Sequence, residues 1–172
     1  MNDREIVYVF IDSQNLNLGV KDQGWSLDFR RFYVYLKEKY KAIRVFLFIG
    51  FMERNAKLYN FLAISGYQIV FKPVLYVDNS SHVKGNVDAE LVLQAMIEYK
   101  RYDKAIIVSG DGDFYCLIKY LKTHNKLGRL IIPNRSKYSQ LLQEFIKDID
   151  FASNLKNKVE IKGEVSQPRT KP

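Results

Sequence analysis

The sequence predicts a three-layer α/β domain, in which a parallel sheet lies between two layers of helices. The chain has 172 residues, enough for one domain with a substantial core. Several short segments are apolar almost without interruption, which is typical of strands buried on both faces. Segments with helical spacing of apolar residues lie between them. This strand–helix alternation predicts a parallel sheet with right-handed crossovers.

The predicted strands are short and rich in β-branched and aromatic residues. The first, "EIVYVFI", and the fourth, "KAIIVS", show the pattern most clearly. The full set covers residues 5–11, 42–50, 67–73, 104–109 and 127–133.

The predicted helices fill the segments between and after these strands. In the first helix, Phe29, Phe32 and Leu36 lie at helical spacing, and Ser26 is the expected N-cap. The second helix is expected to end at Gly66, a suitable C′ residue. The predicted helices cover residues 27–40, 54–65, 87–99, 114–124 and 136–149.

Net charge, cysteine content and the length of the apolar runs limit what kind of protein this is and what it binds. The net charge of +8 fits a polyanionic partner such as nucleic acid, although charge alone does not identify one. One cysteine, Cys116, excludes an internal disulfide and a cysteine-rich zinc site. No apolar run has the length of a membrane span, and the first residues do not resemble a signal peptide, so a cytoplasmic location is expected. One domain is expected over 1–152, followed by a basic, flexible tail over 153–172.

Acidic residues follow the predicted strands at one edge of the sheet. Asp12 closes the first strand, and Asp111 and Asp113 of "SGDGDF" (109–114) follow the fourth. Asp88 lies in the first turn of the helix that follows the third strand. The carboxyl ends of parallel strands meet at one edge, where α/β proteins bind ligands. Asp103 precedes a strand and therefore belongs at the opposite edge. We expect the first four carboxylates to converge.

Convergence of four carboxylates has an electrostatic cost. Two of them about 5 Å apart repel by roughly 3 kcal/mol at an effective dielectric constant near 20. A hard divalent cation with oxygen ligands removes this repulsion, and Mg²⁺ or Mn²⁺ is expected. Taken singly, Asp88, Asp111 and Asp113 are ordinary acids at helix N-termini. Gly112 is expected to let the backbone turn tightly enough to present both of its neighbours.

Three segments resemble the signature segments of NYN domains, the LabA-like branch of the PIN-like nucleases. They are "VFIDSQNL" (9–16), "KGNVDAEL" (84–91) and "IIVSGDGDF" (106–114). The resemblance covers roughly residues 5 to 150. It implies a PIN-like sheet of five parallel strands in the order 3-2-1-4-5, with helices on both faces. It also implies a Mg²⁺- or Mn²⁺-dependent ribonuclease acting on RNA.

The resemblance also assigns roles to individual residues. Asp12, Asp88, Asp111 and Asp113 form the expected acidic metal-binding and catalytic set. Asn15 would orient a ligand or a bound water, and Ser109 and Lys84 match further motif positions. Lys84 is an expected phosphate contact, and Arg54 is a basic loop residue suited to binding a single strand.

Some alternatives are excluded by particular residues and others stay open. A Toprim-like site would need Glu where Asp12 stands, and a haloacid-dehalogenase-like phosphatase would need a second Asp in "DSQNL". A receiver domain would need Lys at the end of the fifth strand, where "IIPNRS" has none. A non-catalytic RNA-binding or adaptor module on the same fold stays open. A homodimer and the number of metal ions also stay open. Endonucleolytic cutting is expected, with exonucleolytic cutting as the alternative.

Overall fold

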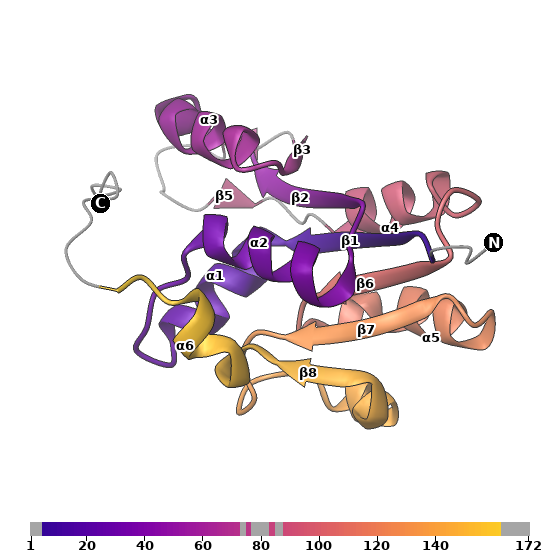
Figure 1. Cartoon of the computed structure of the whole chain (residues 1–172). Coiled ribbons are helices and arrows are strands. Elements are labelled where there is room, and N and C mark those ends of the chain that lie inside the picture. The colour runs from indigo at the N-terminus through magenta and orange to yellow at the C-terminus, as the bar shows by residue number, and fades with distance from the viewer. Residues whose placement is uncertain (1–4, 73–74, 77–82, 85–87, 163–172) are drawn as a thin grey trace.

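A parallel sheet of six strands forms the centre of the domain, in the order β3-β2-β1-β6-β7-β8 (Figure 1). The computed structural model describes residues 5–72, 75–76, 83–84 and 88–162. The strands are β1 (Val7–Asp12), β2 (Arg44–Gly50), β3 (Gln68–Lys72), β6 (Lys104–Val108), β7 (Leu127–Ile132) and β8 (Ile149–Phe151).

The structure confirms the predicted α/β class and the order of the first five strands, but the expectation of five strands is wrong. The sixth strand, β8, pairs with β7 from Leu130↔Ile149 to Ile132↔Phe151. The segment 136–149, predicted as a helix, instead contains the 3₁₀ helix η3 (Gln140–Asp148) and leads directly into β8. A strand of three residues is too short to show the periodicity by which strands are found in a sequence.

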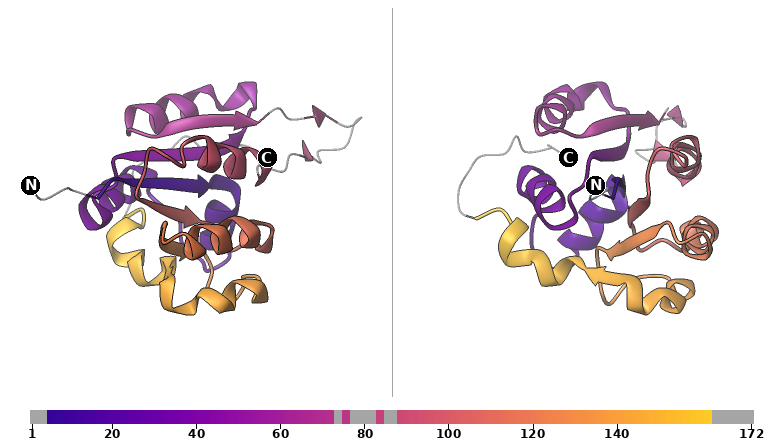
Figure 2. Two further views of the ribbon diagram at one scale, coloured as in Figure 1. Left: turned by 90° about the vertical axis from the view of Figure 1, so that its right-hand side faces the viewer. Right: turned by 45° about the vertical axis from the view of Figure 1, so that its right-hand side comes forward.

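Helices cover both faces of the sheet, which confirms the three layers (Figure 2). On one face lie α1 (Ser13–Lys21), α2 (Phe29–Tyr40), α3 (Ala56–Ile64) and α6 (Lys156–Val159). On the other face lie α4 (Asp88–Ile97), α5 (Tyr115–Thr123) and η3. Residues of β1 alternate between the two cores, with Val9 and Ile11 in the first and Tyr8 and Phe10 in the second. Because helices pack on both faces of the sheet, each strand needs apolar residues on both of its sides.

One of the two helix ends predicted in detail is confirmed, the other is wrong, and one helix was not predicted. The N-cap of α2 is Asp28, not Ser26, because the Asp28 carboxylate accepts a hydrogen bond of 3.0 Å from the Arg31 N–H. Gly66 has φ +108°, which confirms the left-handed residue expected after α3. The sequence did not indicate α1. Its buried apolar side chains are Leu16 and Val20, one turn apart, and this is a weak pattern.

Part of the expected basic tail packs on the domain. Leu155 of the 3₁₀ helix η4 (Ala152–Leu155) and Val159 of α6 are buried in the same core as α2. The Val159 carbonyl oxygen also accepts a hydrogen bond of 2.8 Å from the Asp28 N–H. The packed part therefore extends beyond residue 152, and residues 163–172 lie outside the described residues.

The loop expected over 76–86 is described only in part. A two-stranded antiparallel ribbon pairs β4 (Leu75–Tyr76) with β5 (Val83–Lys84). The rest of that segment lies outside the described residues. Within the described ranges, no helix combines the length and the apolar character needed to cross a bilayer.

Candidate metal centre

The four predicted acids lie at the carboxyl edge of the sheet. Asp12 is the last residue of β1, and Asp88 is the first residue of α4. Asp111 is the N-cap of the 3₁₀ turn η2 (Gly112–Phe114), which contains Asp113. β1 and β6 are neighbours, so the segments that follow them start side by side. The edge predicted from the order of elements is therefore the edge observed.

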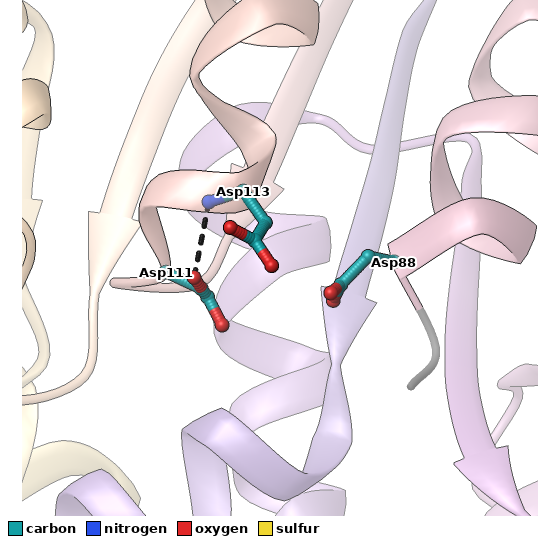
Figure 3. A group of neighbouring side chains, drawn as sticks. All are labelled: Asp88, Asp111 and Asp113. Carbon is teal, nitrogen blue, oxygen red and sulfur yellow. Dashed lines mark hydrogen bonds between the residues drawn. The ribbon is translucent and has the colours of Figure 1, made fainter. Parts of the chain in front are cut away.

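Three of the carboxylates converge. Asp88, Asp111 and Asp113 each contribute one oxygen, and these oxygens lie within 4.8 Å of one another. Figure 3 shows the side chains facing a common space, Asp88 from α4 and the other two from the turn after β6. Asp88 and Asp111 are half-buried, and Asp113 is exposed. The group is thus open to an ion or a ligand on one side.

The donor set fits a hard divalent cation. Mg²⁺ takes oxygen ligands at about 2.0–2.1 Å in octahedral geometry, which places neighbouring ligand oxygens about 3 Å apart and opposite ones about 4 Å apart. The three oxygens lie within 4.8 Å of one another, a spacing at which one ion could be shared by the three carboxylates. The three carboxylates also concentrate negative charge, which such an ion neutralises.

Two hydrogen bonds between residues close in sequence shape the turn that carries two of these acids. The Asp113 N–H donates to Asp111 Oδ1 at 3.0 Å, drawn as the dashed line in Figure 3. The Asp111 N–H donates to the Ser109 hydroxyl oxygen at 3.1 Å. Asp111 therefore caps the turn and faces the cluster at the same time. The two readings of this stretch, helix cap and metal ligand, are compatible.

Gly112 has a packing role in addition to the turn expected there. Among the described glycines, positive φ occurs at Gly24 and Gly66, not at Gly112. A Cβ at position 112 would instead lie 2.4 Å from Ser139 Oγ and 3.0 Å from Ser139 Cβ. The glycine is needed because the turn packs against Ser139, the N-cap of η3. The chain does turn at Gly112, as the start of a 3₁₀ turn, but without a positive φ.

Asp12 lies beside the other three acids, in a different environment. Its side chain is buried, with Oδ1 accepting a hydrogen bond of 3.1 Å from the Asn15 N–H as the N-cap of α1. Oδ2 accepts one of 3.3 Å from the Ser109 hydroxyl. Burial raises the pKa of the Asp12 carboxyl, and the charge of Asp111 raises it further, although these two hydrogen bonds lower it. Asp12 is therefore a largely desolvated acid that lines the same hollow as Asp88 and Asp111.

Asn15 and Ser109 connect these acids to one another. The Gly110 N–H donates to Asn15 Oδ1 at 2.8 Å, which ties α1 to the turn after β6. Ser109 is buried, and its hydroxyl group bonds both Asp12 and the Asp111 N–H. Both of these bonds stay within the protein, so the Ser109 hydroxyl holds two acids in place, while its expected contact with substrate stays a prediction.

The remaining predicted contacts lie away from this cluster or beyond what is described. Arg54 is exposed in the 3₁₀ turn η1 (Glu53–Asn55) after β2, and it lines neither of the hollows at the acidic edge. Lys84 belongs to β5, and its side chain lies outside the described part of the structure.

Two hollows flank the acids, and they include residues that sequence reasoning missed. The first, with a volume of about 290 Å³, lies between α1 and the segment after β7 and includes Asp12, Asp88 and Asp111. The second lies between the turn at Asp113 and the start of η3.

Lys137 and Asp22, which line these hollows, were not predicted. Lys137 follows β7, so the edge argument applied to the acids also indicates this residue; Asp22 lies at the end of the unpredicted α1 and had no such signal.

The fold and the acidic edge together define a PIN-like domain. The family model of the NYN domain matches residues 6–151. This chain belongs to the NYN domain family, as the three sequence segments indicated.

Comparison with individual proteins agrees with this assignment and places the chain in the LabA-like branch. It is 24% identical over 123 residues to the low amplitude and bright protein LabA of Synechococcus elongatus, an alignment covering 66% of each protein. The chain therefore spans just under two thirds of the length of that relative. A protein of unknown function from Vibrio parahaemolyticus shares the fold, with a TM-score of 0.75 and 19% identity over 94% of this chain and 99% of that one.

Proposed function

We propose that the protein is a divalent-metal-dependent ribonuclease that hydrolyses phosphodiester bonds of single-stranded RNA, cutting endonucleolytically. The observation that carries this proposal is the convergence of Asp88, Asp111 and Asp113 within 4.8 Å of one another. Membership of the NYN domain family, whose PIN-like superfamily is generally nucleolytic, supports it. A net charge of +8 fits a polyanionic substrate despite the acidic edge.

Mg²⁺ or Mn²⁺ is the cofactor proposed for this donor set. Asp88, Asp111 and Asp113 would hold it, and Asp12 would add its charge beside them in the same hollow. When bound, such an ion lowers the pKa of a water molecule and stabilises charge on a phosphate.

The residues of the chain have separable tasks in this proposal. Ser109 and Asn15 keep the turn after β6 against α1, so that Asp111 stays beside Asp12. Asp113 is the exposed member of the cluster and therefore the carboxylate best placed to orient an attacking water or accept its proton. Asp12 keeps its buried position because its oxygens already accept hydrogen bonds from Asn15 and Ser109.

A cleavage assay with matched variants tests the proposal. Purified protein is incubated with labelled single-stranded RNA and Mg²⁺ or Mn²⁺, beside Asp111→Asn and Asp103→Asn. Asp103 is an acid at the opposite edge, where its Oδ2 accepts a hydrogen bond from the Ile6 N–H, and Asn can keep that bond. We expect wild type and Asp103→Asn to cut and Asp111→Asn to lose at least about a hundredfold in kcat.

The assay also separates cleavage from binding alone. Cutting that survives Asp111→Asn, or survives removal of the ion by EDTA, would show that the acidic cluster is not the catalytic site. RNA binding without any cutting, in wild type with either ion, would favour the non-catalytic RNA-binding module.

A further inference from the structure

The two hollows at the acidic edge form one groove. The residues that line both are Asn15, Asp111 and Lys137. The first hollow continues from them along α1 to Gly19 and Asp22, and the second continues past Gly112 to Ser139 and Leu141. A strand that passes through both hollows must therefore pass Asn15, Asp111 and Lys137.

The charges along this groove are unequal. Five acids line it: Asp12, Asp22, Asp88, Asp111 and Asp113. Of the lysines and arginines in the described part of the chain, Lys137 alone lines either hollow. A phosphate chain entering such a groove meets mostly negative charge. Among the side chains that the structure describes, Lys137 is the cation placed to neutralise it, besides a divalent ion at the three clustered acids.

The ammonium group of Lys137 is held at the side of the groove. Its Nζ lies 2.9 Å from Asp22 Oδ2, an ion pair that links the segment after β7 to the end of α1. The side chains of Lys137 and Asp22 are 71% and 47% exposed. Exposed ion pairs of this kind contribute little to stability, so the pair is better suited to placing a charge than to holding the fold.

The backbone around Lys137 is well supported. Gln23 Nε2 donates to the carbonyl oxygens of Gly19 and Pro133, both at 2.7 Å, which fastens α1 to the segment after β7. The Lys137 N–H donates to the Asn134 carbonyl oxygen at 3.2 Å. Both walls of the first hollow are therefore fixed relative to each other, and Lys137 extends from one of them.

We propose that Lys137 binds a phosphate of the RNA strand next to the cleaved bond, at the place where the two hollows share their lining with Asp111. This assignment rests on the proposed ribonuclease function and names a substrate-binding residue for it. When the strand enters, the Lys137 ammonium group leaves Asp22 for the phosphate or contacts both. A lysine serves this role as a point charge, without the fixed geometry that arginine would impose.

The test compares Lys137→Ala with Lys122→Ala. Lys122 is a matched control because its Nζ also pairs with an acid, Asp148 Oδ2 at 2.6 Å, and is 51% exposed, but on α5 and outside the groove. We expect Lys137→Ala to raise KM for single-stranded RNA about tenfold, with a much smaller change in kcat. Lys122→Ala should match wild type.

Binding of the same RNA in EDTA gives a second readout. The slope of log Kobs against log salt concentration should fall in magnitude by about 0.7 in Lys137→Ala, the value for one phosphate contact with a single strand. It should be unchanged in Lys122→Ala.

Asp22→Asn separates phosphate binding from a structural role of the ion pair. If Lys137 binds phosphate, loss of its acidic partner should leave RNA binding as tight as in wild type or tighter, opposite to Lys137→Ala. Equal weakening in both variants would overturn the proposal. So would cleavage by wild type that Lys137→Ala leaves unchanged, while the ribonuclease function itself would stand. Absence of both cleavage and RNA binding in wild type would remove both proposals together.

Discussion

The hydroxyl group of Ser109 lies 3.3 Å from Asp12 Oδ2, and its oxygen also accepts a hydrogen bond from the Asp111 N–H at 3.1 Å. This buried side chain thereby joins an acid at the end of β1 to an acid in the turn after β6. Ser109 and Asp12 are 97 positions apart in the chain. The two carboxylates repel each other, as the effect of Asp111 on the pKa of Asp12 shows. Ser109 holds the Asp12 side chain and the Asp111 backbone together against this repulsion.

Replacement of Ser109 by Ala should therefore impair the site and the fold together. We expect a loss of about 1–3 kcal/mol in the free energy of unfolding, because the buried Asp12 oxygen loses its partner. We also expect kcat to fall about tenfold or more, since Asp111 is no longer anchored. Urea denaturation and RNA cleavage measure the two effects. Ser65→Ala is the control, because its exposed hydroxyl donates to the Phe61 carbonyl oxygen far from the site; equal losses in both variants would contradict the role given to Ser109.

Divalent ions should stabilise the wild-type protein. An ion present at 100 times its Kd adds about 2.7 kcal/mol to the free energy of unfolding, provided that it binds the folded state alone. Thermal melting with Mg²⁺ or Mn²⁺ against EDTA should therefore show a higher Tm with the ion. Asp88→Asn should reduce this rise, whereas Asp103→Asn should retain it. A full rise in Asp88→Asn would show that the ion binds elsewhere.

The raised pKa of Asp12 predicts a pH dependence of stability in EDTA. The folded-state pKa lies above the unfolded value of about 3.9, so between these two values the folded state binds more protons than the unfolded one. The free energy of unfolding then falls as pH rises through that window. Asp12→Asn removes this contribution while its side-chain oxygen can still accept the cap bond. Denaturation between about pH 3 and pH 7 should show wild type losing stability relative to Asp12→Asn; a constant difference would contradict the assignment.

The contact between Gly112 and Ser139 gives a prediction with its own rescue. Gly112→Ala places a Cβ 2.4 Å from Ser139 Oγ, so either the turn at Asp113 or the start of η3 must move. We expect a loss of about 1–3 kcal/mol in stability, the usual cost of overpacking, together with lower kcat. The double variant Gly112→Ala/Ser139→Gly should recover much of both, because glycine is tolerated at an N-cap. Failure of the double variant to recover would mean that backbone conformation, not the Ser139 contact, requires glycine.

Much of the domain could be predicted from sequence because its signals are local. The apolar strands, buried on both faces, show as unbroken runs in the chain, and alternation with helices limits the topology to a parallel sheet. The same reasoning placed Asp12, Asp88, Asp111 and Asp113 at one edge, since a parallel sheet directs all its strand ends the same way. Family resemblance then supplied the strand order and the proposed chemistry.

Other features depend on contacts between residues far apart in the chain. β8 has three residues and exists through its pairing with β7, while α1 is a mostly polar helix held by two buried apolar side chains and by the cap at Asp12. Gly112 is required by Ser139, and Lys137 meets Asp22 across 115 positions. No local pattern reports such contacts, because each depends on how separate elements pack.

The acidic site shows where this boundary falls. Local patterns suffice to bring the four carboxylates to the same edge of the sheet, because strand direction and element order follow from them. Packing of the folded chain is what makes Asp88, Asp111 and Asp113 converge and leaves Asp12 buried beside them. That division arises from desolvation and from the hydrogen bonds of Asn15 and Ser109, which belong to the packed molecule and not to any segment of it.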